Sequence, residues 1–396
     1  MRKISTGGFH ATERTRELVE GILESGRISY GDISREFERR FAVAHSAKYA
    51  TLSNSGTSSL HVALQAMKEL HGWSDGDEVI VPATTFVATA NIVIHVGMQP
   101  VFVDIEPNSY GVDPDLIEAK ITDRTRAIIP VHLFGQPCKM REILPIAHAH
   151  NLRVIEDSCE AMFVTHFNQP VGSMGDIGCF SMYVAHLLTT GVGGISITSN
   201  PDYAIKMRSL VNHGLSVDNL NLDEYYQPRP MSNRRFLFDS TGHSFRITEF
   251  EAALGLAQLD TWEEMIKTRV RNGKHYTASL RLINSNYEFP VYKVAEILPG
   301  NEHAYMMYPI VLNRDKAGAI VDKEKLTGYL NERGIETRDM LPILRQPAFS
   351  YLPPQDYPVS DWIEQSGFYV GSHQFLSTDD VKYTINALSE FASENL

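Results

Sequence analysis

Two stretches decide the fold of this 396-residue chain: FSMYVAHLLTTGVGG at Phe180–Gly194 and IEDSCEA at Ile155–Ala161. The first contains a serine, Ser181, and a histidine five residues later, His186, and it ends in a Gly-Val-Gly-Gly turn before an apolar strand pattern. The second is an apolar strand pattern that ends on acidic residues. Because α/β proteins bind ligands at the carboxyl ends of buried strands, we expect a ligand site at Asp157.

These two stretches together suggest one cofactor, pyridoxal phosphate. Its ring nitrogen needs an anionic partner to stay protonated, so that the ring can act as an electron sink. An acidic strand end supplies the anion, a serine hydroxyl suits the phosphate, and a histidine supplies a reactive nitrogen base.

Strand and helix patterns alternate through the first half of the chain. This alternation predicts an α/β fold with a mostly parallel sheet and with ligands at the carboxyl ends of its strands. Two amphipathic helices are expected before the alternation, at 13–24 and 32–43. The strand patterns lie at 77–82, 100–105, 127–134 and 153–157, and the helical patterns at 83–97, 113–120 and 140–150.

The run SNSGTSSL at Ser53–Leu60 follows a short apolar stretch and opens a helix expected at 57–69. Free backbone amides and the helix dipole both favour an anion at such a helix start. We therefore expect Gly56, Thr57 and Ser58 to bind a phosphate group. Serine-rich helix starts are also common without any ligand, so the run by itself leaves both interpretations open.

The pattern changes after residue 260. A long charged helix is expected at 262–282, strands within 303–312 and a further helix at 323–333. We expect residues 1–260 to form a large cofactor-binding domain and residues 261–396 to form a smaller C-terminal α/β domain.

Composition excludes several classes of protein. The net charge of −12 disfavours nucleic acid and anionic membranes as partners, whereas a nucleotide-sugar substrate needs only a few local donors. No apolar run of 18 residues predicts a transmembrane helix, and the N-terminus lacks the apolar core of a signal peptide. The three cysteines fit no metal or disulfide pattern, so we expect a protein of the reducing cytoplasm.

Several motifs, in order over nearly the whole chain, carry a family resemblance. The chain resembles the DegT/DnrJ/StrS family of sugar aminotransferases and dehydratases, which are fold-type I pyridoxal-phosphate enzymes. The resemblance implies an aminotransferase-like fold and a homodimer with shared active sites. The motifs are SNSGTSSL (53–60), PATTFVATANIV (82–93), PVFVDIEP (100–107), PVHLFGQP (130–137), EDSCEA (156–161), GDIGCFS (175–181) and FRITEFEAALGLAQL (245–259).

One departure from the family pattern decides the expected reaction. Aminotransferases of the family carry a lysine, bonded covalently to the cofactor, where this chain has His186. An imidazole has no primary amine and cannot form that bond. The segment YVAHL instead resembles the histidine branch of the family, the GDP-4-keto-6-deoxymannose 3-dehydratases.

The resemblance to the histidine branch implies an activity. A dehydratase of this kind uses pyridoxal and pyridoxamine phosphate, with L-glutamate as amino donor. It removes the C3 hydroxyl of a nucleotide-linked 4-keto-6-deoxyhexose, in the biosynthesis of deoxysugars for polysaccharides such as lipopolysaccharide. His186 would be the catalytic residue, because an imidazole can both take and return a proton near neutral pH.

The resemblance also assigns roles at the cofactor. Phe86 would stack on the pyridine ring, Asp157 would bind the ring nitrogen, and Glu160 would lie near the ring hydroxyl. Ser181 would contact the phosphate. Ser244 stands where the family usually has an asparagine that reaches the phosphate of the neighbouring subunit.

Arg338 and Arg345 are candidates for the substrate diphosphate or for the co-substrate carboxylate. Exposed arginines are usually only solvated, so that interpretation stays open as well.

Two other functions stay open. The chain could be a sugar aminotransferase that works without the lysine, or a member of the fold that has lost its chemistry. The retained Asp157 and Ser181 argue against the second, and Val192 is a departure from the family, which usually has an acidic residue in this Gly-x-Gly-Gly turn. A deoxygenation route that uses an iron–sulfur cluster is rejected, because three scattered cysteines cannot supply four thiolates.

Overall fold

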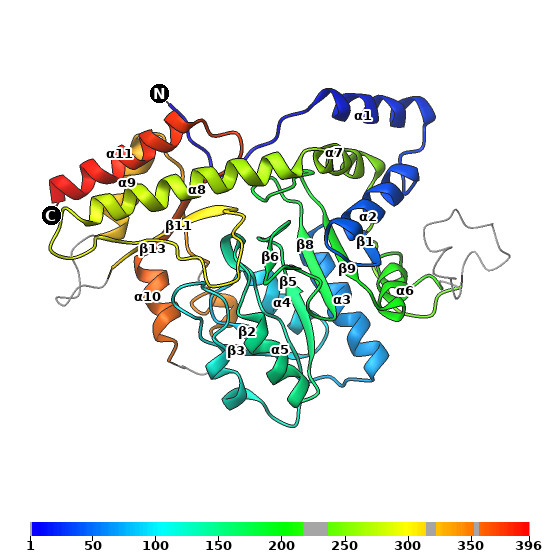
Figure 1. Ribbon diagram of the computed structural model, residues 1–396. Coiled ribbons are helices and arrows are strands. Elements are labelled where there is room, and N and C mark those ends of the chain that lie inside the picture. The colour runs from blue at the N-terminus through cyan, green and yellow to red at the C-terminus, as the bar shows by residue number, and fades with distance from the viewer. Residues whose placement is uncertain (1, 217–236, 314–321, 342, 352–355, 396) are drawn as a thin grey trace.

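A seven-stranded sheet forms the centre of the first half of the chain (Figure 1). Its strands are β1 (Tyr49–Ser53), β2 (Glu78–Pro82), β3 (Gln99–Val103), β4 (Thr125–Ile128), β5 (Arg153–Asp157), β8 (Ile177–Ser181) and β9 (Gly194–Thr198). The fold is that of a computed structural model, which describes residues 2–216, 237–313, 322–341, 343–351 and 356–395.

The strand order is β1-β9-β8-β5-β4-β2-β3. Every neighbouring pair from β8 to β3 is parallel, and β9 runs antiparallel to both β8 and β1. The expected mostly parallel sheet is therefore confirmed. The carboxyl ends of β5 and β8 lie side by side, because Asp157 pairs with Cys179 in the register.

Helices cover both faces of this sheet. They are α3 (Gly56–His71), α4 (Val87–His95), α5 (Met140–Ala149) and α6 (Pro201–Leu210). Side chains alternate between the two faces along a strand, so β2 serves two cores. Val79 and Val81 pack in the cluster that contains α3, α4 and α6, whereas Ile80 between them packs in the cluster that contains α5.

The prediction of an α-helix at 113–120 is wrong. The chain forms two short 3-10 turns there, η1 (Pro114–Leu116) and η2 (Glu118–Lys120), with hydrogen bonds from Ile117 N–H to the Pro114 carbonyl and from Lys120 N–H to the Ile117 carbonyl. So short a segment cannot repay the cost of nucleating an α-helix unless it buries a whole apolar face, and Leu116 is exposed.

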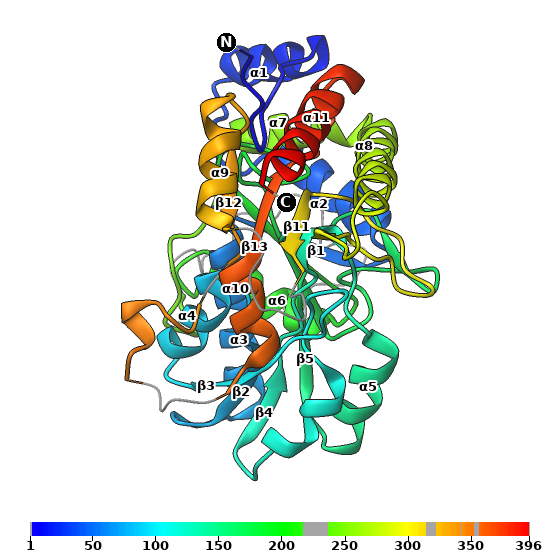
Figure 2. The same cartoon turned by 90° about the vertical axis from the view of Figure 1, so that its left-hand side faces the viewer.

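The C-terminal part of the chain builds a second, antiparallel sheet in the order β10-β11-β13-β12. Its strands are β10 (Tyr292–Lys293), β11 (Met307–Leu312), β12 (Thr337–Asp339) and β13 (Gly367–Gly371). The helices of this part are α8 (Trp262–Asn284), α9 (Lys323–Glu332), α10 (Pro358–Ser366) and α11 (Thr378–Asn395). Figures 1 and 2 show α8, α9 and α11 together at one end of the molecule.

A division of the chain at residue 260 stays a prediction. The first sheet ends at Thr198 and the second begins at Tyr292, but the N-terminus also joins the second part. Ile4 forms a bridge with Ile335 and packs in the core of the C-terminal part.

Three further helices pack together beside the sheet: α1 (Glu13–Ser25), α2 (Asp32–Ala44) and α7 (Glu249–Leu259). The first turn of α2 lacks a capping side chain of its own, and Glu249 of α7 takes that role by accepting the N–H groups of Gly31 (2.7 Å) and Ser34 (3.1 Å). The remaining elements are η3 (Leu133–Gly135), β6 (Thr165–His166), β7 (Gln169–Pro170) and η5 (Pro347–Phe349). None of the described helices is long and apolar enough to cross a membrane.

Candidate active site

Asp157 ends β5 at the carboxyl edge of the sheet, and its side chain is buried. The Thr89 hydroxyl donates to Oδ2 (2.8 Å), and the Cys159 backbone N–H donates to Oδ1 (3.2 Å). Burial raises the pKa of this carboxyl, and the two donors oppose that rise. A buried carboxylate in this state gains most from a cationic partner, such as a protonated ring nitrogen.

The residue before Asp157 holds the strand end in place. Glu156 points to the opposite face of the sheet, is fully buried, and accepts backbone N–H groups from Gly172 (2.8 Å) and Gly175 (2.6 Å). It also pairs with His132 at 2.9 Å. The ring of His132 accepts the Cys138 N–H at Nδ1 (3.0 Å), so its proton lies on Nε2, toward Glu156. With every one of these groups satisfied, the end of β5 is rigid.

Phe86 is the N-cap residue of α4, just before the helix begins. Residues three apart on a helix share a face, so Phe86 stands one turn from Thr89, whose hydroxyl reaches Asp157. Phe86 is 58% exposed, so its ring is accessible from outside the chain. An exposed ring one helical turn from the threonine that binds the buried carboxylate is available to stack on a flat ligand.

The start of α3 meets the end of β8. A Cβ on Gly56 would come within 2.6 Å of the Ser181 Cβ and 2.9 Å of the Cys159 Sγ, so only glycine allows this approach. The first N–H groups of a helix have no acceptor within it, which makes those of Gly56 and Thr57 available to an anion. Ser58 differs, because its N–H donates to the Ser55 hydroxyl (3.1 Å) and its own hydroxyl donates to Asn54 (2.6 Å).

His186 lies in the loop between β8 and β9. Two backbone hydrogen bonds close this loop, from Met182 N–H to the Gly193 carbonyl (2.9 Å) and from Thr190 N–H to the Met182 carbonyl (2.8 Å). The Nδ1 atom of His186 is buried and has no hydrogen-bond partner among the described residues. Burial lowers the pKa of its imidazole to about 4, and the charge of Arg269 acts in the same direction.

No lysine lies near His186 in the sequence. The chain contains none between Lys139 and Lys206. Lys139 lies 3.9 Å from the Glu106 carboxylate, and Lys206 pairs with Glu69 at 3.1 Å. Both amines are thus paired away from the loop.

Glu160 follows β5 and accepts the Phe134 N–H at Oε2 (2.8 Å). Burial raises the pKa of its carboxyl to about 7, with the nearby charge of Asp157 acting in the same direction. The protonated form can donate a hydrogen bond, which an ionised carboxylate cannot do.

Arg338 on β12 belongs to the same region. It donates to Glu336 from Nε (3.0 Å) and Nη2 (2.9 Å). Burial raises the pKa of Tyr369 to about 12, the charge of Glu160 adds to that rise, and the charge of Arg338 opposes it. Arg338 and Glu160 therefore act on the same phenol, and the C-terminal part of the chain contributes to the site.

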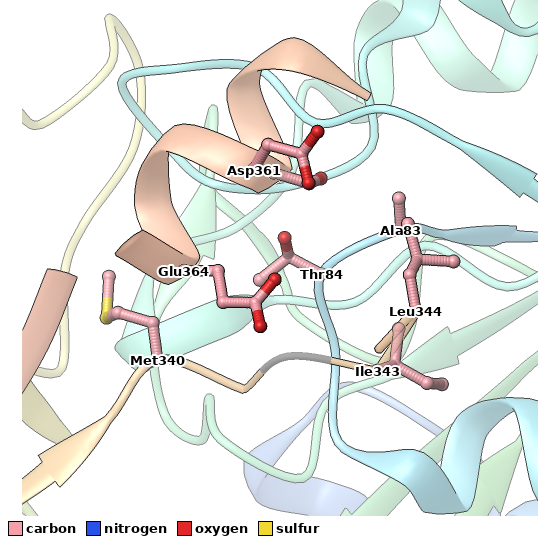
Figure 3. Close-up of a pocket in the computed structure, with 8 residues that line it drawn as sticks. Ala83, Thr84, Met340, Ile343, Leu344, Asp361 and Glu364 are labelled. Carbon is pink, nitrogen blue, oxygen red and sulfur yellow. The ribbon is translucent and has the colours of Figure 1, made fainter. Parts of the chain in front are cut away.

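Arg345 is paired with carboxylates of its own part of the chain. Arg345 pairs with Asp361 (2.8 Å) and Glu364 (2.9 Å), which line a small cleft with Thr84 and Met340 (Figure 3). Binding of a diphosphate by Arg345 would require the anion to displace both carboxylates.

The Ser244 side chain is exposed and accepts a hydrogen bond from Arg246 (3.1 Å). The next residue places the segment beside the expected phosphate-binding run Ser53–Leu60, called the phosphate cradle below, because the Phe245 carbonyl accepts the Asn54 N–H (2.7 Å). A contact of Ser244 with the cofactor of a second subunit stays a prediction.

Sequence reasoning missed three residues of this region: Thr89, Tyr369 and Arg269. The spacing of Thr89, one helical turn after Phe86, could have identified it. Tyr369 and Arg269 have no local signal, because they reach the site from the C-terminal part of the chain.

These residues fit pyridoxal phosphate. Asp157 would hold the ring nitrogen, Phe86 the ring face, and Gly56, Thr57 and Ser181 the phosphate. The glycine that opens the approach to Ser181 and the buried, unpartnered nitrogen of His186 are the features that an empty structural site would not need. The cofactor, when bound, supplies an electron sink.

Comparison with known proteins agrees with this fit. The model of the DegT/DnrJ/EryC1/StrS aminotransferase family matches residues 10–389. The GDP-perosamine synthase of Caulobacter vibrioides is 35% identical over 98% of this chain and 98% of its own length. The dTDP-4-dehydro-2,6-dideoxy-D-glucose 3-dehydratase of Saccharopolyspora spinosa is 31% identical, over 96% of this chain and 84% of its own.

A solved structure extends the likeness to the fold. The E. coli GDP-4-keto-6-deoxy-D-mannose 3-dehydratase, with bound hydrated pyridoxal phosphate, superposes with a TM-score of 0.87 over 98% of this chain and 100% of its own, at 24% identity. The expected fold and cofactor are therefore confirmed. The chain belongs to the DegT/DnrJ/EryC1/StrS aminotransferase family, and pyridoxal phosphate is its cofactor.

Proposed function

We propose that this protein is a 3-dehydratase that removes the C3 hydroxyl of a nucleotide-linked 4-keto-6-deoxyhexose, with L-glutamate as co-substrate, in deoxysugar biosynthesis for a polysaccharide such as lipopolysaccharide. The observation that carries the proposal is His186. It stands where aminotransferases of the family have their lysine, and the chain has no lysine from 140 to 205. The dehydratase named among the relatives supports the same reaction class.

The state of His186 suits proton transfer in both directions. With a pKa of about 4, its imidazole is neutral at neutral pH and can take a proton from a bound reactant. The imidazolium that forms is then more acidic than an ordinary imidazolium, and it returns the proton to the C3 oxygen, which leaves as water. The Nδ1 atom of the ring has no hydrogen-bond partner among the described residues, so this nitrogen is available to a bound reactant.

Other residues would bind and orient. Asp157 holds the positive ring nitrogen, Phe86 covers the ring, and the protonated form of Glu160 donates toward the ring hydroxyl. Arg338 is our first candidate for the substrate diphosphate, because its charge reaches Tyr369 in the region of Glu160. Arg345 is the second, subject to release from its two carboxylates.

The stoichiometry of the reaction provides the test. Loss of the C3 hydroxyl reduces the sugar by two electrons, and oxidation of glutamate to 2-oxoglutarate and ammonia supplies them. One 3-deoxy sugar, one 2-oxoglutarate and one ammonia should therefore appear together. The assay uses GDP- and dTDP-linked 4-keto-6-deoxyhexoses with glutamate and quantifies all three products.

A sugar aminotransferase is the second candidate, favoured by the GDP-perosamine synthase among the relatives. It would release 2-oxoglutarate without ammonia and leave a 4-amino sugar with its C3 hydroxyl intact. Neither product pattern would appear with a catalytically inactive member of the family. The same three measurements thus separate all three functions.

The dehydratase proposal also predicts that the cofactor binds without a covalent bond. Borohydride reduction followed by peptide mass spectrometry should leave every lysine of the chain unlabelled. The matched control is His186→Lys, in which the new lysine should be labelled. A stable cofactor adduct on a lysine of the unchanged protein would contradict the proposal.

We further propose a homodimer with shared sites, because Ser244 is exposed on a segment that passes beside the phosphate cradle. Light scattering of the holoenzyme at assay concentration should give twice the mass of the 44.5 kDa chain. A fully active monomer would contradict this part of the proposal alone.

A further inference from the structure

Arg269 is a buried cation on α8, with a side chain that is 1% exposed. Within the described ranges it forms no ion pair; its nitrogens donate to oxygens of neutral groups instead. Burial lowers the pKa of its guanidinium to about 9. Burying a charge without a counter-charge costs free energy, so we expect Arg269 to have a role that offsets this cost.

The acceptors of Arg269 show what it holds. Nη1 donates to the carbonyl of Met306 (2.9 Å) and, more weakly, to that of Tyr305 (3.4 Å). Nη2 donates to the carbonyl of His186 (3.3 Å), and Nε donates to the side-chain oxygen of Gln374 (2.9 Å). One rigid guanidinium thus joins three separate segments, one of which carries the proposed catalytic imidazole.

The 304–306 segment leads to the other titratable group of the site. The Ala304 N–H donates to the Gly135 carbonyl (2.8 Å), and the Met306 N–H donates to the Phe134 carbonyl (3.0 Å). Phe134 in turn donates its own N–H to Glu160 (2.8 Å). The side chain of Arg269 therefore connects to both His186 and Glu160 through main-chain groups.

The sequence of α8 explains why this helix can present the guanidinium there. Residues 269, 272, 273 and 276 share one face, at helical spacings of three and four. Gly273 lets the Tyr305 ring lie against the helix, since a Cβ would come within 2.3 Å of it. Asn272 donates to the carbonyls of Ser372 (3.5 Å) and His373 (3.2 Å). Asn272 thus makes similar contacts, but none with the loop that carries His186.

We propose that Arg269 is a positioning residue of the active site. It fixes the main chain at His186 relative to the segment that supports Glu160, and thereby fixes the direction of the imidazole. The inference rests on the proposed function for the identity of the reaction. Its effect on His186 can be measured in the resting protein, independently of any reaction.

The groups around His186 make that effect measurable. Tyr183 lies edge-on to the imidazole, with ring centroids 6.1 Å apart. Arg338 interacts electrostatically with Tyr183. Among the described residues, the charge that acts on the His186 imidazole itself is that of Arg269, and it lowers the pKa of that ring. Removal of this charge should therefore raise the pKa of His186.

The test compares Arg269→Gln and Arg269→Lys with the control Asn272→Ala. The ring of His186 is followed by NMR during a pH titration of protein with isotope-labelled histidine. A His186→Asn variant identifies its signal among the 15 histidines. We expect a higher His186 pKa in Arg269→Gln, a smaller change in Arg269→Lys, which keeps the charge, and none in Asn272→Ala.

The kinetic readout separates positioning from binding. Misplacement of a catalytic group by about 1 Å costs on the order of 10²-fold in rate. We therefore expect kcat of the wild-type reaction, whichever product it gives, to fall about that much in Arg269→Gln while KM changes little. Arg269→Lys should recover part of the loss.

Three results would overturn the proposal. Arg269→Gln could leave both the His186 titration and kcat unchanged, or Asn272→Ala could produce the same changes. The two Arg269 variants could also fail to fold while Asn272→Ala folds, which would make Arg269 a residue of the fold alone. If the wild-type protein transfers an amino group to the sugar while Arg269→Gln still shifts the His186 titration, the dehydratase proposal is refuted and this inference stands.

Discussion

Replacing Asp157 by asparagine removes the negative charge of the proposed ring-nitrogen partner at almost constant shape. The Thr89 hydroxyl can turn toward the Thr85 hydroxyl, 2.8 Å away, when an amide replaces Oδ2, and the remaining amide oxygen can still accept the Cys159 N–H. The fold should therefore survive. The loss is the hydrogen bond between carboxylate and ring nitrogen, and hydrogen bonds to charged groups are worth about 1.5–3 kcal/mol. That range corresponds to a weakening of cofactor affinity by about 10- to 150-fold.

The assay titrates the cofactor-free protein with pyridoxal phosphate and follows its absorbance, after a thermal melt has shown that the variant is folded. The matched control is Asp176→Asn. Asp176 accepts the Val154 N–H (2.8 Å) at the other end of β5, so its replacement should leave cofactor affinity unchanged. Activity of Asp157→Asn should fall at least as far as affinity does. An affinity within threefold of wild type, together with an undiminished turnover, would refute Asp157 as the ring partner.

Three further predictions concern His186, Glu160 and Glu249. His186→Lys should reduce 3-deoxy-sugar formation by about 10²- to 10⁴-fold, the usual contribution of general acid–base catalysis, and should give a visible absorbance band with the cofactor; equal rates in variant and wild type would make His186 a packing residue. The pKa of Glu160 rises from 4.5 to about 7 on folding, so the folded state binds more protons than the unfolded state in that interval. Stability of the cofactor-free protein should fall as pH rises from about 4.5 through 7, by at most about 3 kcal/mol in urea titrations, and Glu160→Gln should remove that slope unless Glu160 ionises normally. Glu249→Gln should cost about 1–2 kcal/mol of stability, because the charged acceptor that caps α2 is lost, while cofactor affinity stays the same; a change in affinity without one in stability would contradict this role.

Local sequence patterns determined much of the fold and part of the candidate site. Apolar runs that end on a carboxylate located β5 and Asp157, and glycine with hydroxyl residues located the start of α3. These features depend on residues adjacent in sequence, because side-chain alternation, helix capping and backbone freedom are local properties. The same local reasoning failed at 113–120, where a plausible helical pattern was too short and too exposed to form an α-helix.

The tertiary structure alone decided which polar groups are buried together. In sequence, Arg269 stands in a charged helix that is typical of a solvated surface, and Arg345 is likewise an arginine with no local sign of burial. Packing buries Arg269 against the His186 carbonyl. Arg345 stays exposed and pairs with Asp361 and Glu364. The pKa values of His186 and Glu160 have the same origin. They depend on desolvation by the folded protein around each group, and burial of that kind is a property of the assembled elements that no short stretch of residues encodes.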